Sequence, residues 1–473
     1  MSEFRTVSFL RRVSQHLHAS VRGRRRIVVC LVGVVILGAG SAIADVYLRN
    51  LFPFLDFTGF SGTYSNTGSV DLSGPFFQSL GTNGRSCGTC HAPSDAFGLS
   101  AADAQLRYLL TRGKDPLFDQ FDGSTCPTGA INNTLVTHNG LIRIPLIVPP
   151  NTTDSQGDQT VSVYRRPLPT TNLGFLSAMM FDGRESLTNP LNDEDTFTTN
   201  LNMDLTQQAI DATLEHAQAT QPPTATQLSQ IVGFELALNS AQLSDFAAGN
   251  LSKGANGGAQ FLSTQPYYPG INDSLGGDPH GNPFTPQVFT IYSSFQNSRN
   301  PQQASIARGE QIFNTQALTI TDVPGLTTGT QPIAGTCTTC HDTFNVGNHS
   351  FPLPLDIGVS HSLTYETDPN IIAGIKELQP ATLPVFELVC TQGSLAGATY
   401  YTSDPGKALI TGQCADIGRG KGLILRGLAG RAPYFHNGSA ANLQQLVNFY
   451  NQRFQIGLTP QEKKDLINFL QTL

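Results

Sequence analysis

Two copies of the pentapeptide Cys-x-x-Cys-His, at residues 87–91 and 337–341, have the clearest capacity for chemistry in this chain. Two thiols at this spacing can add to the two vinyl groups of one porphyrin, and the next histidine can ligate its iron. The sequence therefore predicts two covalently bound haem c groups. The predicted attachment and iron-ligating residues are Cys87, Cys90 and His91 in the first copy and Cys337, Cys340 and His341 in the second.

Paired cysteines also support other chemistries. Two Cys-x-x-Cys pairs could form one tetrahedral zinc site or two redox-active dithiols. Neither chemistry needs a histidine directly after each pair, and neither copy follows the strand-then-helix pattern of thioredoxin-like proteins. We therefore favour haem at both copies.

The N-terminus has the pattern of an export signal. Seven arginines precede an apolar run of 18 residues, 27–44, that ends in Ala-Ile-Ala. This pattern predicts that residues 1–44 are a signal peptide cleaved before Asp45. Because 18 apolar residues are close to the length that spans a bilayer, an uncleaved membrane anchor over residues 27–44 is the alternative. In both cases the remaining chain is expected in the periplasm.

The exported part is acidic. The formal net charge is −7 for the whole chain and −13 without residues 1–44, which hold seven arginines and one glutamate. Such a surface does not suit nucleic acid, whereas it could suit a basic, small electron-donor protein. The remaining 429 residues exceed what one core usually organises, so we expect two domains, 45–300 and 301–473, with one haem motif each.

Residues 301–473 contain the expected first and last helices of a cytochrome c domain. The segment 304–314 places Gly309 and Phe313 at helical spacing. It resembles the first helix of a cytochrome c fold, in which a glycine and an aromatic residue allow a close crossing with the terminal helix. A capping box at 459–462 predicts where that terminal helix begins.

The fold class is predicted to be mainly α, with long irregular loops. Apolar residues at helical spacing predict helices over 206–219 and 224–243. The segments 115–160 and 251–300 are rich in Gly, Pro, Asn, Ser and Thr, which predicts ordered loops.

Three cysteines of the exported part lie outside the haem motifs. In an oxidising compartment Cys390 and Cys414 are the expected disulfide, because they are close in sequence and flank a stretch rich in Gly, Thr and Tyr. Cys126 is then left over, either as a buried small hydrophobe or in a different pair.

The side chains on the other face of each iron decide what each haem can do. Methionine, the usual sixth ligand of an electron-transferring haem c, is absent from residues 301–473. The candidates for that position in the C-terminal domain are His349, His361, His436 and Tyr450.

At the N-terminal haem the candidate distal histidines are His138, His216 and His280. His216 follows Glu215 on a predicted helix, and either side chain could move a proton between the two oxygens of a bound peroxide. The alternative is that both face solvent.

Two further motifs carry a family resemblance. The sequence Phe-Asp-Gly-Arg at 181–184 lies between the haem motifs, and Arg-Ala-Pro-Tyr-Phe-His-Asn-Gly-Ser begins at Arg431. Over most of 73–473 the chain resembles the bacterial di-haem cytochrome c peroxidase superfamily, which includes MauG and, more distantly, the di-haem rubber oxygenases. The resemblance implies two cytochrome c-type domains packed together, with electrons handled at the C-terminal haem and peroxide or oxygen reacting at the N-terminal haem.

The resemblance also implies roles for single residues. Tyr450 lies fourteen residues after His436, where the family places the distal ligand of the C-terminal haem, a methionine in the peroxidases and a tyrosine in MauG. The alternatives are that Tyr450 is a packed aromatic residue and that His436 is the ligand. Arg184 is expected to hold haem propionates or to polarise the distal pocket.

The chain departs from the family at two places. Phe181 stands where the peroxidases have a tryptophan between the haems, which puts a radical relay through this residue in doubt but leaves direct tunnelling intact. Arg107 stands where they have a distal histidine, so the N-terminal haem is expected to be open. A distal-pocket glutamate of the family aligns loosely near 215–218.

The leading hypothesis is a periplasmic di-haem peroxidase. Hydrogen peroxide would react at the His91 haem, with electrons entering through the His341 haem from a small cytochrome c or cupredoxin. The alternatives are an oxidase or oxygenase that uses dioxygen on an organic substrate, as in MauG or the rubber oxygenases, and a non-enzymatic di-haem electron carrier. The resemblance leaves calcium open, because the peroxidases hold one such ion between their domains.

Overall fold

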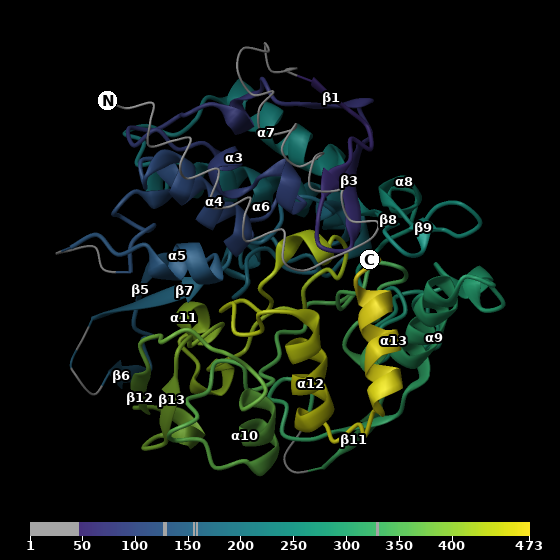
Figure 1. Cartoon of the computed structure of the whole chain (residues 1–473). Helices are drawn as coiled ribbons and strands as arrows, with labels where there is room; N and C mark the ends of the chain where they lie inside the picture. Colours follow the sequence, from purple (N-terminus) through teal and green to yellow (C-terminus); the bar gives the residue numbers. More distant parts are fainter. Residues whose placement is uncertain (1–46, 126–129, 155–156, 158, 328–330) are drawn as a thin grey trace, which may run out of the picture. The chain divides into compact units, whose positions relative to one another are not determined.

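The computed structural model of this chain describes residues 47–473, with gaps at 126–129, 155–156, 158 and 328–330 (Figure 1). The expected export segment 1–44, its cleavage point and Cys126 lie outside the described residues. Within the described ranges, no helix combines the length and the apolar character needed to cross a membrane.

Short and medium helices carry both haem motifs and most of the core. The α-helices of the described part are α3 (Cys87–Cys90), α4 (Ala101–Thr111), α5 (Thr134–Asn139), α6 (Glu194–Glu215), α7 (Ala225–Ala237), α8 (Ala259–Leu262), α9 (Pro301–Thr315), α10 (Pro369–Ile375), α11 (Ala408–Thr411), α12 (Leu443–Arg453) and α13 (Pro460–Leu470).

Small antiparallel sheets accompany these helices, in the orders β1-β4, β10-β11, β13-β12-β6, β2-β3-β8-β9 and β5-β7. The prediction of a mainly α fold is therefore confirmed only in part. The strands are β1 (Tyr47–Arg49), β2 (Phe54–Leu55), β3 (Gly59–Ser65), β4 (Ser69–Asp71), β5 (Ile142–Ile147), β6 (Thr152–Asp154), β7 (Thr160–Arg165), β8 (Leu238–Asp245), β9 (Gly249–Asn250), β10 (Leu318–Ile320), β11 (Ile333–Gly335), β12 (Phe386–Cys390) and β13 (Thr399–Thr402).

Helices α9 and α13 cross closely, as the sequence predicts, and Figure 1 shows them side by side. Gly309 lies at the crossing, and a Cβ atom there would overlap the carbonyl of Asp465 on α13. Phe313 packs on Phe469, with ring centroids 5.8 Å apart. The predicted capping box at Thr459 starts α13. These contacts anchor the largest buried apolar cluster of the C-terminal half.

The helix predicted over 224–243 is wrong in its last six residues. Helix α7 ends at Ala237, and the chain continues as strand β8. Strand β8 pairs with β3 along its length, and Ser240 accepts or donates a hydrogen bond with the Thr63 hydroxyl at 2.7 Å. Long-range pairing therefore overrides the helical spacing of the apolar residues in this segment. The helix predicted over 206–219 is part of α6, which begins earlier and ends at Glu215.

Contacts between the two expected domains are extensive. Strand β6, from the expected N-terminal domain, pairs with β12 of the expected C-terminal domain. The predicted disulfide Cys390–Cys414 is present and ties the end of β12 to the chain after α11. Residues 47–473 form one compact unit, so a division at residue 300 stays a prediction.

Candidate haem sites

The first Cys-x-x-Cys-His motif forms a single helical turn that a capping box stabilises. Thr89 and Ser86 form a capping box around α3. The next residue, His91, places Nδ1 3.1 Å from the carbonyl oxygen of Phe97. Burial lowers the pKa of His91 to about 4, against the opposing effect of the Phe97 and Leu168 carbonyls. The imidazole is therefore neutral, with Nδ1–H donating to Phe97, which leaves Nε2 as a potential iron ligand.

The second motif repeats this geometry. Thr336 and Thr339 form the same capping box, and His341 Nδ1 lies 2.6 Å from the carbonyl oxygen of Gly347. Burial lowers the pKa of His341 to about 4 as well. In both motifs the carbonyl that receives the Nδ1–H belongs to the sixth residue after the histidine. Each histidine is thus oriented as a proximal haem ligand would be.

The four motif cysteines are enclosed thiols that do not gather with other metal-binding side chains of the described residues. Burial raises the pKa of Cys87, Cys337 and Cys340 to about 12 and that of Cys90 to about 11. Neutral thiols are poor nucleophiles and poor metal ligands. Among the described residues, the grouping of metal-binding side chains that could hold an ion contains no cysteine. The sequence alternatives of a shared zinc site or redox dithiols therefore lose support.

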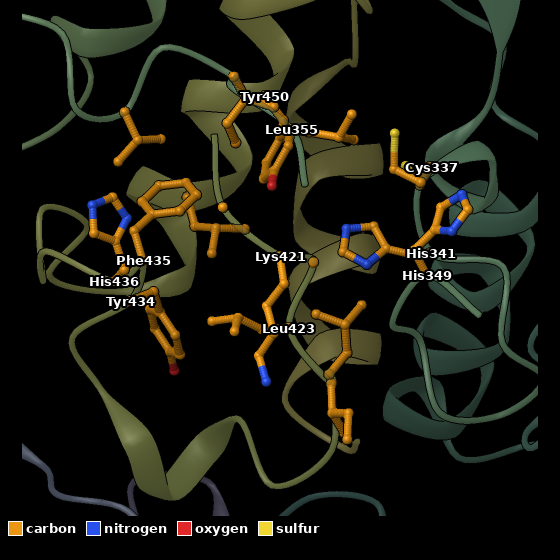
Figure 2. A pocket seen from close by; sticks show the side chains of 18 of the residues that line it. Cys337, His341, His349, Leu355, Lys421, Leu423, Tyr434, Phe435, His436 and Tyr450 are labelled. Atoms are coloured by element: carbon orange, nitrogen blue, oxygen red, sulfur yellow. The ribbon is translucent and has the colours of Figure 1, made fainter. Parts of the chain in front are cut away.

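A cavity of about 250 Å³ lies against the second motif (Figure 2). Cys337, Cys340 and His341 line one wall. The other walls are predominantly apolar and include Leu355, Leu423, Phe435, Val447 and Phe454. A slot with two thiols and an imidazole at one wall and apolar side chains at the others fits a covalently attached porphyrin.

Tyr450, on α12, reaches into this cavity. Burial, together with the nearby Cys340 and Cys337, raises the pKa of its hydroxyl. The side chain is half-buried, and within the described part of the chain its hydroxyl has no hydrogen-bond partner. Phe435, Phe449 and Phe454 surround the ring. A hydroxyl that faces the cavity without a protein partner suits a haem ligand, and ligation by Tyr450 stays a prediction.

The three histidine candidates for the same position are already engaged by protein atoms. His361 bonds through Nε2 to Asp356 at 2.7 Å and through Nδ1 to Glu366. His349 lines the cavity, but its Nδ1 bonds to the Phe351 carbonyl and its Nε2 lies beside the carboxylates of Asp342 and Asp273.

His436 is held by stacking. Its ring lies on that of Phe181, with centroids 4.1 Å apart and planes 16° apart, and its Nε2 is 3.1 Å from the Ser360 hydroxyl. The Arg165 guanidinium lies 5.1 Å from the Phe181 ring centroid and pairs with Asp404 at 2.7 Å. Phe181 and His436 both line the cavity, so the predicted cofactor-binding pair forms one stacked element of its wall.

Three cationic side chains also line the cavity: Arg431, which is buried, and Arg166 and Lys421, which are half-buried. Burial lowers the pKa of Lys421 to about 7 and those of both arginines to about 10. These side chains donate hydrogen bonds to backbone carbonyls, such as Lys421 Nζ to Ala178 at 2.8 Å. In the described part of the chain no carboxylate forms an ion pair with any of them. Because buried charges are normally paired, these cations fit the propionates of a haem.

Arg184, predicted for that role, is paired elsewhere. Its guanidinium contacts Asp182 at 3.1 Å and Glu185 at 3.7 Å, and it does not line the cavity. The propionate role of Arg184 stays a prediction that these ion pairs do not favour. The stronger candidates on electrostatic grounds are the three unpaired cations.

A polar network lies beside the first motif. His216 follows α6, and its Nδ1 is 2.7 Å from a carboxylate oxygen of Asp122. Asp122 also pairs with Arg85, and both are almost fully buried. The Asn83 amide donates to the His216 carbonyl at 2.8 Å, which fastens His216 to the chain just before the motif. His216 is close enough to His91 for its charge to lower the pKa of His91.

The other residues predicted near the first haem lie elsewhere. Glu215, His138 and His280 are exposed. Arg107 bonds to Asp115 and, at 2.6 Å, to the carbonyl of Thr89 inside the motif. Of the predicted set, His216 is thus the residue that the fold brings towards His91.

Three residues near the first motif are missed by sequence reasoning. Asp122 and Arg85 belong to loops, where a single charged residue gives no pattern. Glu235 is buried on α7 with one carboxylate oxygen lacking a hydrogen-bond partner, and burial raises its pKa to about 8. Its charge acts on Cys87. An acidic residue within the apolar periodicity of α7 is the signal that could have revealed it.

Comparisons with known proteins complete the description. No family model matches the chain. A cytochrome-c peroxidase, IdrP2 of Denitromonas iodatirespirans, is 30% identical over 135 residues, which are 27% of this chain and 35% of that protein. The structure of a MauG-like protein associated with microbial copper homeostasis aligns over 84% of this chain and 87% of its own, at 14% identity and a TM-score of 0.35. The resemblance predicted from the motifs is confirmed by the sequence match, which covers about a third of the peroxidase.

Proposed function

We propose that this chain, which resembles the di-haem cytochrome c peroxidases, is an exported di-haem oxidoreductase that reduces hydrogen peroxide beside His91. The observation that carries the proposal is an asymmetry. Both motifs orient their histidines alike, but His91 has the His216–Asp122 pair nearby, whereas His341 faces a largely apolar cavity with Tyr450. Acid–base groups belong where a substrate reacts, and an enclosed apolar slot suits electron transfer.

The haem groups would supply an iron that binds peroxide and a second iron that stores an electron. The reaction itself consumes two electrons and two protons per hydrogen peroxide and yields two waters. His216 would move a proton between the two peroxide oxygens, so that the O–O bond breaks with water as the leaving group. Asp122 accepts the Nδ1–H of His216 and so leaves Nε2 free to carry that proton.

The second half would receive the electrons from a small cytochrome c or cupredoxin in the periplasm. Its cavity extends to Leu168, whose carbonyl acts on the His91 ring, and to the stacked Phe181 and His436. These residues would lie between the two irons and keep them in a water-poor medium. Because phenylalanine is hard to oxidise, electrons would tunnel past Phe181 rather than stop on it.

The test is a stopped-flow absorbance titration of the fully reduced, haem-loaded exported protein with hydrogen peroxide. We expect rapid loss of two electrons for each peroxide added. Silence towards peroxide would overturn the proposal; a high-spin haem in that silent protein would indicate an oxygenase, and two low-spin haems an electron carrier. The Glu235→Gln variant tests the other buried acid near the motif and is expected to retain the reaction.

A further inference from the structure

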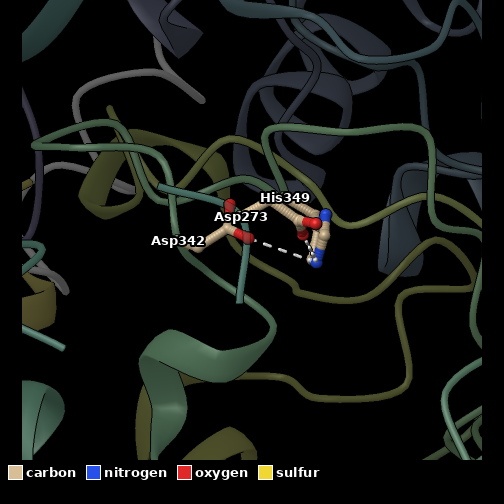
Figure 3. Close-up of side chains that lie close together, drawn as sticks. All are labelled: Asp273, Asp342 and His349. Carbon is tan, nitrogen blue, oxygen red and sulfur yellow. Dashed lines mark ion pairs between the residues drawn. The ribbon is translucent and has the colours of Figure 1, made fainter. Parts of the chain in front are cut away.

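Three buried ionisable side chains lie together beside the second haem motif (Figure 3). They are Asp273, Asp342 and His349, each less than a twentieth exposed. His349 Nε2 is 3.2 Å from Asp342 Oδ2 and 3.5 Å from Asp273 Oδ1. One ligand atom from each residue lies within 4.8 Å of the other two. Two carboxylates and an imidazole are thus enclosed together, and no lysine or arginine of the described residues forms an ion pair with either carboxylate.

In each of the three side chains, the polar atom outside this contact bonds to a backbone group. His349 Nδ1 lies 3.1 Å from the Phe351 carbonyl oxygen, which can only accept, and 3.4 Å from the Phe351 backbone N–H; the shorter contact favours the proton on Nδ1. Asp273 Oδ2 accepts from the backbone N–H of Gly277 at 2.6 Å. Asp342 Oδ1 accepts from the backbone N–H of Ser350, also at 2.6 Å.

The atoms that face one another are left poorly satisfied. In the described part of the chain, Asp273 Oδ1 and His349 Nε2 are buried without a hydrogen-bond partner. Asp342 Oδ2 receives only a long contact of 3.3 Å from the backbone N–H of Ser274. Backbone bonds that orient imidazole and carboxylate ligands from behind are typical of protein metal centres.

We propose that Asp273, Asp342 and His349 bind a divalent first-row transition metal, with zinc the best fit. Two zinc bonds of about 2.0–2.2 Å at a tetrahedral angle separate their donor atoms by about 3.3–3.6 Å. The two observed separations, 3.2 and 3.5 Å, are close to that range. A bound dication would also balance the two carboxylates. Calcium fits poorly, because it takes six to eight oxygen ligands and the central donor here is a nitrogen.

The metal would brace the haem-binding segment. Asp273 belongs to a loop of the expected N-terminal domain, whereas Asp342 directly follows His341. The same loop is already fastened there, because the Ser274 hydroxyl donates to the Thr339 carbonyl at 2.6 Å. A metal bound across these segments would hold the second motif in place without touching the haem iron. This inference does not rest on the proposed function, since it concerns a separate ion.

The test is elemental analysis of the haem-loaded exported protein after incubation with zinc chloride and desalting, with haem counted separately by its pyridine haemochrome. We expect about one zinc, or an equivalent first-row metal, per chain in addition to the haem iron. The His349→Gln and Asp273→Asn variants are expected to lose that metal while keeping two haems. Asp278→Asn is the matched control, because Asp278 accepts from Asn272 N–H in the same loop but lies outside the cluster.

A second measurement uses only the native chain, so it does not depend on the variants folding. Removal of the metal with EDTA is expected to lower the melting temperature of the native protein, and zinc chloride is expected to restore it. Absence of stoichiometric metal after incubation with zinc chloride would overturn the proposal, as would equal metal in both variants and the control. Either result would leave a buried imidazolium–carboxylate cluster, and the peroxide titration would be unaffected.

Discussion

The two haem motifs share their local structure and differ in everything around it. In each, a capping box closes the cysteine turn and a backbone carbonyl fixes the histidine ring. Around His341 the fold builds a cavity with mainly apolar walls, which Tyr450 also lines. Near His91 it builds a charged network that is still a third exposed at His216. The motif therefore sets the proximal side of a haem, and long-range packing sets what the haem can do.

The difference also appears in how the two regions are held. The second motif rests on two helices that cross without intervening side chains at Gly309. The first motif also packs on buried helical residues, but the loops beside it are fastened by side chains such as Arg85, which donates to the carbonyls of Pro116 and Leu117. Loops fastened by polar bonds can admit solvent and substrate, whereas packed helices exclude them. The predictions below separate the two regions.

The largest effect is expected from His216→Ala. Loss of the proton-transfer group should lower kcat/KM for peroxide by about 10²- to 10⁴-fold, while both haems remain bound. The measurement is steady-state peroxide reduction with a reduced donor protein. His138→Ala is the control, because this histidine is exposed and its ring contacts Thr134 and Thr137 of its own helix. Unchanged activity in His216→Ala would contradict the assignment of chemistry to the first motif.

Tyr450→Met is expected to act on the second haem alone. Exchange of a phenol for a thioether ligand should raise the reduction potential of that haem on the order of 100 mV. Potentiometric titration followed in the visible spectrum would resolve the two haems. Tyr434→Phe is the control, because Tyr434 lines the same cavity but its hydroxyl donates to the Leu428 carbonyl at 3.0 Å. A shift in both variants, or in neither, would argue against Tyr450 as a ligand.

Gly309→Ala should destabilise the protein by about 2 kcal/mol, because the added methyl group overlaps the backbone of α13. Gly233→Ala is the matched helix glycine in the first half, and a Cβ there meets nothing within 4 Å. That control should be neutral or stabilising by about 0.5–1 kcal/mol. Chemical denaturation of the haem-loaded protein measures both. Equal effects would mean that the helix crossing is no tighter than an ordinary helix surface.

Sequence reasoning succeeded where the signal was local. The haem motifs occupy five consecutive residues each, and a cysteine pair 24 residues apart sufficed to predict the disulfide Cys390–Cys414. Gly309 and Phe313 predicted the helix crossing because a known fold requires small and aromatic residues there. The capping box at Thr459 predicted the start of α13 because side-chain caps act within one turn.

Sequence reasoning failed where the residue that a side chain or strand contacts is distant in sequence. Leu238 begins a strand because this segment pairs along its length with β3, which lies far earlier in the chain. Asp122 meets His216 across almost a hundred residues, and no spacing rule joins them. The unpaired Lys421 and Arg166 are single charges until folding buries them around one cavity. Local patterns thus predict ligands and caps, whereas the surroundings that separate the two haems come from tertiary contacts.

The smallest expected effect is a change in the stability of the protein with pH, at the wall of the second cavity. Although burial alone lowers it, the carboxylates of Asp356 and Glu366 raise the pKa of His361 to about 10 from 6.5. The bond from His361 lowers the pKa of Glu366 to about 2 from 4.5. The stabilisation from His361 is therefore complete below pH 6.5 and is lost as pH rises through 10. That from Glu366 is complete above pH 4.5 and is lost as pH falls through 2.

Loss of stability as pH rises through 10 is therefore expected to trace to His361, in the second region. We expect the melting temperature of the native protein to exceed that of His361→Gln most at pH 6 and least at pH 10. His138→Gln should show no gap that changes with pH, because its side chain is exposed. The difference in melting temperature between the native protein and His361→Gln could instead stay constant from pH 6 to pH 10. That result would mean that the imidazole is neutral throughout and that the ion pair does not brace Asp356 in the cavity wall.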